Sequence, residues 1–215
     1  MLAQKSQPFD PLAFPHHNEQ HMPTLDNRLF EAEKINERIG TVLGNRYTYE
    51  RRVTLPLAYL NLSLDHHRAI ILLMRSGLFG SAMALVRPTF EAMIRSHWVA
   101  GCATETQVEE IAEKDDFKFP KMDDMTAAVD RVFSDPNDEE LTFFQQAKKD
   151  GWEAMNSYTH SGLRQLARQF SGDRVESRYP ETDLISGVNA STTSVLLHGY
   201  LIAKISGQEE AARQL

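Results

Sequence analysis

Hydrophobic residues recur along most of this chain at intervals of three and four, which is the spacing of one face of an α-helix. At no point do hydrophobic and polar residues alternate for long enough to predict a strand. The helices that the pattern predicts cover residues 26–43, 48–75, 78–99, 105–113, 122–133, 138–148, 152–170 and 181–206. The chain is therefore expected to be all-α, with helices packed on helices.

The longer helices are expected to form an antiparallel bundle, with the shorter ones added around it. The bundle helices are those near residues 48–75, 78–100, 152–170 and 181–206. Asp26 is positioned to cap the first helix. Pro88 lies inside a helical pattern, and because proline has no backbone N–H we expect a kink there. The residues predicted to face the core include Leu29, Phe30, Ile39, Leu60, Ile71, Leu72, Phe90 and Trp98.

Residues 1–25 read as an irregular arm, and residues 26–215 as one helical domain. The arm contains four prolines, and each of them disfavours helix at the residue before it. We expect the arm to add little to the stability of the domain. Its apolar side chains would instead suit packing on a partner chain, as in a homodimer; they are Phe9, Leu12 and Phe14.

Composition narrows the class of protein. With 215 residues, 41% of them hydrophobic and 25% charged, the chain suits one large or two small globular domains. A net charge of −7 means that nucleic acid would need a local basic patch. Cys102 is the only cysteine, which excludes an internal disulfide and fits a cytoplasmic location. Arginines interrupt the longest apolar stretch, residues 69–102, so we expect no membrane span. No cofactor motif occurs.

Two polar clusters interrupt the hydrophobic faces, and a functional site is expected where they meet. In the first, Arg87 and Glu91 are four residues apart and share one helix face. In the second, His160 and Arg164 have the same spacing, provided that the helix continues through Gly162. A buried charge is costly unless it is paired, so the two clusters are expected to lie within one neighbourhood. Two flanking residues complete the set, Asn156 and Tyr158.

This set of side chains has two interpretations. In one, Arg87, Glu91 and His160 are catalytic residues that act on a phosphate ligand, since guanidinium groups bind phosphate in bidentate fashion and histidine can move a proton. Arg164, Asn156 and Tyr158 would then bind that ligand. In the other, the same groups form an ion-pair network that fixes helix packing. An open pocket lined by these side chains favours the first interpretation, and a sealed core favours the second.

Asp65, His66 and His67 form a further cluster. Successive residues on a helix point about 100° apart, so these three cannot all bind one metal ion. They remain weak metal candidates, and we expect no metal site.

The residues 155–160, Met-Asn-Ser-Tyr-Thr-His, resemble the signature of the HEPN superfamily of small helical bundles. That signature is an arginine followed by a polar residue, with a histidine four to six residues further on. Asn156 and His160 match it, whereas a methionine occupies the place of the arginine. The resemblance implies a metal-independent ribonuclease site, often at a dimer interface, in a toxin or defence system. Arg87 or Arg164 would have to supply the guanidinium.

A longer pattern over residues 60–170 resembles bacterial families of uncharacterised helical proteins. It consists of Asp-His, Gly-Leu-x-x-Ser-Ala, Arg-Pro-x-x-Glu-Ala and Tyr-Thr-His-x-Gly. The sequence therefore predicts a cytoplasmic bacterial protein that acts as a non-catalytic interaction or regulatory module. The alternative is a HEPN-like ribonuclease or phosphate-ligand-binding protein, with RNA or a phosphate compound as its partner.

Overall fold

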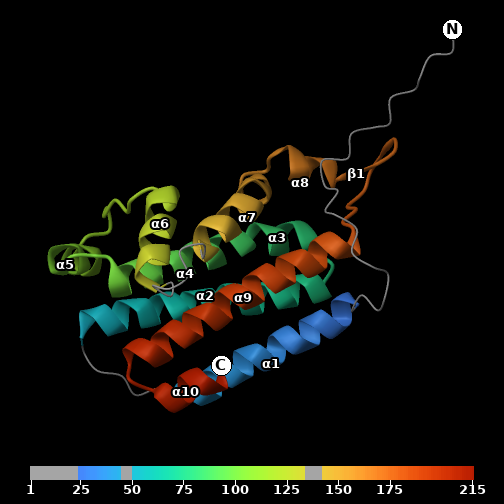
Figure 1. Ribbon diagram of the computed structural model, residues 1–215. Coiled ribbons are helices and arrows are strands. Elements are labelled where there is room, and N and C mark those ends of the chain that lie inside the picture. Colours follow the sequence, from blue (N-terminus) through green and yellow to red (C-terminus); the bar gives the residue numbers. More distant parts are fainter. Residues whose placement is uncertain (1–23, 45–49, 134–141) are drawn as a thin grey trace, which may run out of the picture.

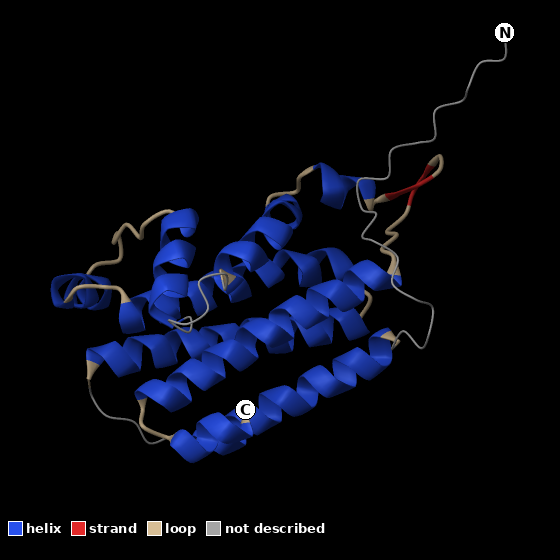
Figure 2. Ribbon diagram, viewed as in Figure 1, coloured by secondary structure: helices blue, strands red, loops and turns tan. Residues whose placement is uncertain are grey.

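The computed structural model describes residues 24–44, 50–133 and 142–215 (Figures 1 and 2). Nearly all of the expected arm, and the start of the helix expected over 138–148, lie outside these residues. The elements in chain order are α1 (Leu25–Leu43), α2 (Arg51–Arg75), α3 (Phe79–Ala84), α4 (Val86–Gly101), α5 (Glu105–Glu113), α6 (Met122–Phe133), α7 (Phe143–Thr159), α8 (Leu163–Ala167), β1 (Phe170–Ser171), β2 (Arg174–Val175), α9 (Glu181–Ile205) and α10 (Glu209–Gln214).

Four long helices, α1, α2, α4 and α9, pack together at the centre, which confirms the predicted all-α bundle (Figure 1). Helix α2 runs opposite to α4 and α9, since Pro56 near its start bonds Ser96 and His198 near their ends. The fourth central helix is α1, and not the segment 152–170 that we expected. Helix α1 buries a full stripe of side chains, whereas α7 buries only Phe144, Met155 and Tyr158 and lies outside the bundle.

The core follows the predicted hydrophobic faces, with two errors. Phe30 and Leu72 are 54% and 64% exposed, while their neighbours Leu29 and Ile71 are buried. A shift of one residue rotates a side chain by about 100° around a helix, so each wrong residue lies just beside the buried stripe. The core therefore contains the side chains of Leu29 and Ile71, whereas those of Phe30 and Leu72 are exposed to solvent.

Pro88 interrupts the chain differently from the predicted kink. Helix α3 ends at Ala84 and α4 begins at Val86, so Pro88 lies in the first turn of a new helix. The proline ring clashes with the carbonyl four residues earlier and cannot donate a hydrogen bond to it. That carbonyl belongs to Ala84, and it accepts a hydrogen bond of 3.1 Å from the Thr159 hydroxyl of α7. The break at Pro88 therefore fixes the end of α7 against the start of α4.

Two local predictions are corrected at helix ends. The first helix is capped by Thr24, whose hydroxyl accepts from the Asn27 amide, and Asp26 lies in the first turn. The helix expected over 152–170 is broken, because α7 ends at Thr159 and Ser161 adopts a left-handed φ of 54°. A short hairpin of β1 and β2 follows α8, in a region where no strand was predicted.

Candidate functional site

The structure brings Arg87, Glu91 and His160 together, as the sequence predicted. The Arg87 Nε donates to Glu91 Oε1 over 2.7 Å, one turn further along α4. A terminal nitrogen of the same guanidinium contacts Nε2 of His160, the residue that follows α7. One arginine therefore links a carboxylate of its own helix to an imidazole of another.

The fold holds these groups in place from two sides. The hydrogen bond from Thr159 to the carbonyl of Ala84 anchors the residue next to His160. From the other side, the ring of Trp152 on α7 stacks against Arg87, with the guanidinium carbon 4.8 Å from the ring centroid. A guanidinium over an indole ring is a favourable cation–π contact. The position of Arg87 is thus set by a carboxylate, an imidazole and an aromatic face.

A second arginine extends the cluster along α4. Arg95 NH2 lies 3.4 Å from the other carboxylate oxygen of Glu91, and its guanidinium lies 4.9 Å from the centroid of Phe119. The side chains of Arg87 and Glu91 are 20% and 18% exposed, and that of Arg95 is 37% exposed. Two positive charges therefore flank one negative charge, which leaves a net positive charge at the site.

The contact between Arg87 and His160 also defines the imidazole tautomer. A guanidinium has donors only, so Nε2 of His160 is the acceptor in this contact. The ring proton of the neutral imidazole is then on Nδ1. If the guanidinium turned toward a ligand, Nε2 would be left with an accessible lone pair, which is the form needed to accept a proton.

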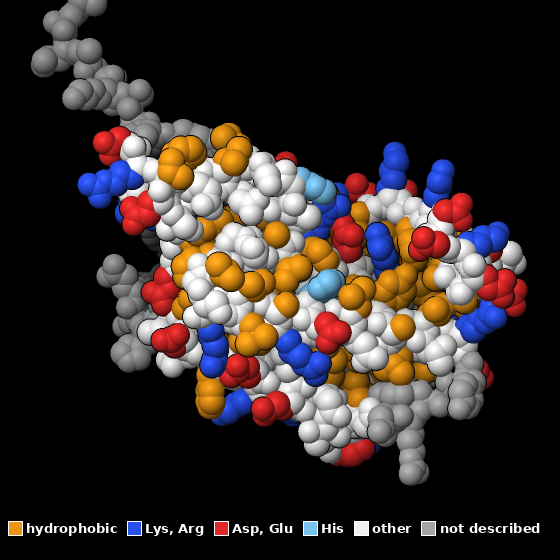
Figure 3. Space-filling view, turned by 180° about the vertical axis from the view of Figure 1, so that it is seen from behind, with side chains coloured by type: hydrophobic (Ala, Val, Ile, Leu, Met, Phe, Trp, Pro, Cys, Tyr) orange, Lys and Arg blue, Asp and Glu red, His pale blue; other side chains and the backbone are white. Residues whose placement is uncertain are grey.

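Arg87, Glu91 and Arg95 line an open pocket of about 960 Å³, and not a sealed core, whereas His160 is not one of its lining residues. Its walls come from α2, α4, α5, α6, α7 and the segment between α5 and α6. Aromatic side chains, cations and carboxylates share this lining, which includes Arg87, Arg95, Lys114, Lys118, Glu91, Glu113, Asp115, Tyr59, Phe117, Phe119 and Trp152. On the face shown in Figure 3, basic, acidic and hydrophobic side chains adjoin one another around a hollow.

The other predicted ligand residues lie elsewhere. Arg164 and Tyr158 line a second pocket, whose walls are largely apolar. The Asn156 side-chain oxygen is buried, with no hydrogen-bond partner among the described residues. The expectation that Arg164 shares a helix face with His160 fails because the helix breaks at Ser161. The backbone N–H of Arg164 instead donates to the Ser157 hydroxyl over 3.0 Å.

The cluster of Asp65, His66 and His67 does not converge. His67 is fully buried, and its two ring nitrogens bond the side chains of Asn36 and Thr192 at 3.0 and 2.9 Å. Burial lowers the pKa of His67 to about 4. Asp65 is exposed and lies beside Arg68. Within the described part of the chain, no group of three or more His, Cys, Asp or Glu side chains is placed to hold a metal ion.

Sequence reasoning missed Arg95, Trp152 and Phe119 as parts of the site. Arg95 follows Glu91 by four residues, so the spacing that marked Arg87 was available for it as well. The two aromatic residues carry no such signal. They come from α7 and from the segment before α6, and only the packing of these elements against α4 brings them to the arginines.

Comparison with known proteins places the chain in a family without placing it in a functional class. The chain belongs to the family described as Family of unknown function (DUF6988), whose model matches residues 60–215. No curated protein and no solved structure matches it. Among the described residues, no helix is long and apolar enough to cross a membrane.

Proposed function

We propose that this member of the DUF6988 family binds single-stranded RNA in the pocket around Arg87 and cleaves it without a metal ion. The observation that carries the proposal is that Arg87 and Glu91 line an open pocket while His160, which is not one of the lining residues, contacts the guanidinium of Arg87. Such a placement favours ligand chemistry over a purely structural network. The resemblance of residues 155–160 to the HEPN signature supports the same class of reaction, with Arg87 of α4 supplying the guanidinium.

The charges of the pocket suit a phosphate group. Glu91 holds Arg87 through Nε and His160 contacts one terminal nitrogen, which leaves the other terminal nitrogen for a phosphate oxygen until the contact with His160 opens. The pocket is lined by four cations, Arg87, Arg95, Lys114 and Lys118, and by three carboxylates, Glu91, Glu113 and Asp115, so its formal charge is +1 in a protein whose net charge is −7. An acidic protein needs a local excess of positive charge in order to bind RNA.

The aromatic residues of the pocket suit unpaired bases. Tyr59, Phe117, Phe119 and Trp152 all line it. Stacking on an aromatic side chain contributes roughly 1–3 kcal/mol per base and requires bases that are not paired. Single-stranded RNA provides both the phosphate groups and the free base faces, so it matches the pocket better than a duplex does.

In the proposed reaction, the phosphate draws Arg87 away from His160, and Nε2 then accepts the proton of a ribose 2′-hydroxyl. The 2′-oxygen attacks the adjacent phosphorus, and the bond from phosphorus to the 5′-oxygen breaks. The leaving oxygen takes a proton from water, which gives a 2′,3′-cyclic phosphate and a 5′-hydroxyl end, and the hydroxide that remains takes the proton back from His160. Arg87 and Arg95 stabilise the charge on the non-bridging oxygens, and Glu91 orients Arg87.

Cleavage of an end-labelled single-stranded RNA in the presence of EDTA tests the proposal. Loss of a general base costs about 10²–10⁴-fold in rate, so His160→Ala should fall by that factor while its RNA affinity, measured by fluorescence anisotropy, stays within a few-fold. His66→Ala, at a partly exposed histidine outside the pocket, should cleave like the wild type. No binding or cleavage by the wild type, or equal cleavage by His160→Ala, would refute the proposal.

The second candidate is a non-catalytic interaction module in which the same residues fix helix packing. It is favoured by the carboxylate of Glu91, which already lies within ion-pair distance of both Arg87 and Arg95. Under this hypothesis the wild type has no affinity for RNA, and Glu91→Ala lowers stability without affecting any ligand.

A further inference from the structure

A second pocket lies between α7 and α9. It has a volume of about 380 Å³, within the range of small-molecule sites. Its sides are formed largely by small residues of the two helices, and its floor by large apolar residues from α3 and α4. The small residues include Gly151, Ala154, Gly187 and Ala190, and the large ones include Met83 and Met93.

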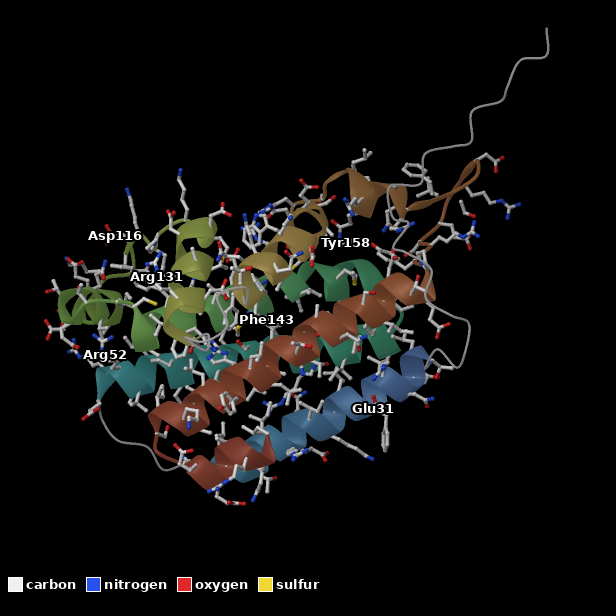
Figure 4. All side chains as sticks on the ribbon, viewed as in Figure 1. Glu31, Arg52, Asp116, Arg131, Phe143 and Tyr158 are labelled. Atoms are coloured by element: carbon white, nitrogen blue, oxygen red, sulfur yellow. The ribbon has the colours of Figure 1, made fainter. Side chains whose placement is uncertain are left out.

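The second pocket is a slot that is long as well as apolar. It extends along α7 from Phe143 to Tyr158, which both line it and lie near opposite ends of that helix (Figure 4). Fifteen residues of α-helix rise about 22 Å. A long apolar slot of this volume suits a flexible alkyl chain better than a compact ring system.

One end of the slot has polar groups that are free to bind a ligand. Arg164 lies there, and its ion pair among the described residues is with Glu153, at 4.0 Å, whose side chain is 89% exposed. An exposed pair at this distance contributes little. The acidic residue at the same end, Asp183, is already paired with Arg168 at 2.6 Å. The guanidinium of Arg164 is therefore available to an anion.

Tyr158 adds a donor beside Arg164. The guanidinium of Arg168 is close enough to the phenol to hydrogen-bond it, and because a guanidinium only donates, the phenol oxygen is the acceptor. The phenolic O–H then remains to donate to a ligand. Asp150, which also lines the slot, is eight residues and so about 12 Å along the helix from Tyr158. It bonds the side chain of Gln146 over 2.7 Å.

From these observations we infer that the slot binds a medium-chain carboxylate. The alkyl chain lies between α7 and α9, and the carboxylate accepts hydrogen bonds from Arg164 and Tyr158. The inference does not depend on the RNA proposal, since the two pockets share no lining residue.

Isothermal titration of the full chain with dodecanoate, below the concentration at which it forms micelles, tests this inference. Dodecan-1-ol serves as the matched probe, with the same chain and no charge. We expect one dodecanoate per chain and a weaker affinity for the alcohol. Arg164→Gln should weaken dodecanoate binding by about 10–100-fold, the usual effect of losing a hydrogen bond to a charged group, and should leave alcohol binding unchanged.

Two further variants locate the binding. Ala190→Trp fills the slot from an exposed position of α9, where the ring does not disturb the core, and should abolish binding of both probes. Arg174→Gln removes an exposed arginine of β2 and should bind as the wild type does. Absence of dodecanoate binding by the wild type would overturn the inference. Unchanged binding by Ala190→Trp, or equal affinities of wild type and Arg164→Gln, would overturn it as well.

Discussion

Two groups of polar side chains interrupt the hydrophobic helix faces of this protein, and the fold treats them in opposite ways. Arg87 and Glu91 line an open pocket, and His160 contacts Arg87. His97 and His198 lie in the core between α4 and α9, where they are 4% and 0% exposed. Arginine keeps its charge under all ordinary conditions, which explains why Arg87 lies beside a carboxylate at an open pocket, whereas histidine can be buried as a neutral ring.

The buried histidines are satisfied as neutral rings. His198 Nε2 donates to the carbonyl of Pro56 over 3.1 Å, so its Nδ1 accepts from the Ser63 hydroxyl at 3.1 Å. His97 Nδ1 donates to the carbonyl of Met93 over 2.8 Å. Burial lowers the pKa of His97 to about 4. Burial, with the nearby His97 as a second cause, lowers the pKa of His198 well below its ordinary value. His97 and His198 are therefore buried in the core as neutral rings, each bonded to a backbone carbonyl.

The largest effect should be a loss of stability in acid, which the buried histidines cause and the cluster at the open pocket does not. The folded pKa values of His67 and His97 are about 4, below the ordinary 6.5, so the unfolded chain binds more protons at pH values between these limits. Stability is full above about pH 6.5 and falls toward pH 4, by up to about 1.4 kcal/mol per pH unit for each histidine. The measurement is the free energy of urea unfolding across this range. His67→Gln should have a shallower slope than the wild type, and parallel curves would contradict the prediction.

The second largest effect should be the loss of unfolding free energy when one buried histidine is removed. His198→Ala removes a fully buried ring and leaves the Pro56 carbonyl and the Ser63 hydroxyl without it, which should cost about 3–4 kcal/mol of unfolding free energy at pH 7.5. The control is His66→Ala, which removes a histidine from a partly exposed position of α2. It should cost less than about 1 kcal/mol. Equal losses in the two variants would mean that burial of His198 is not what stabilises the core.

The smallest effect is expected at the open pocket. Glu91→Ala breaks ion pairs that are intermediate in exposure, so it should cost about 1–2 kcal/mol, between the values typical of exposed and of buried pairs. The matched control is Glu110→Ala, which breaks an exposed pair of the same spacing with Lys114 and should cost about 0.3–0.5 kcal/mol. A loss at Glu91 no larger than the control would show that the cluster does not hold the helices together.

Local patterns along the chain predicted much of the fold. The bounds of α5 and α6 agree with the predicted ranges 105–113 and 122–133, because a polar N-terminus and a hydrophobic stripe are properties of one short segment. The pairing of Arg87 with Glu91 was predictable for the same reason, since both lie on one helix. Trp152 and Phe119 were not, because their contacts with the arginines depend on how separate elements pack.

The sequence by itself determined the all-α class, most helix bounds and the contact between Arg87 and Glu91, since helix periodicity and a spacing of four residues act locally. Only the tertiary structure decided which helices form the centre and that Pro88 lies in the first turn of a new helix. It also decided that the carbonyl of Ala84 accepts a hydrogen bond from Thr159 of α7. It also separated Arg164 from His160, through the break at Ser161. These outcomes depend on contacts between residues far apart in the chain, and the free energy of those contacts is a property of the packed molecule.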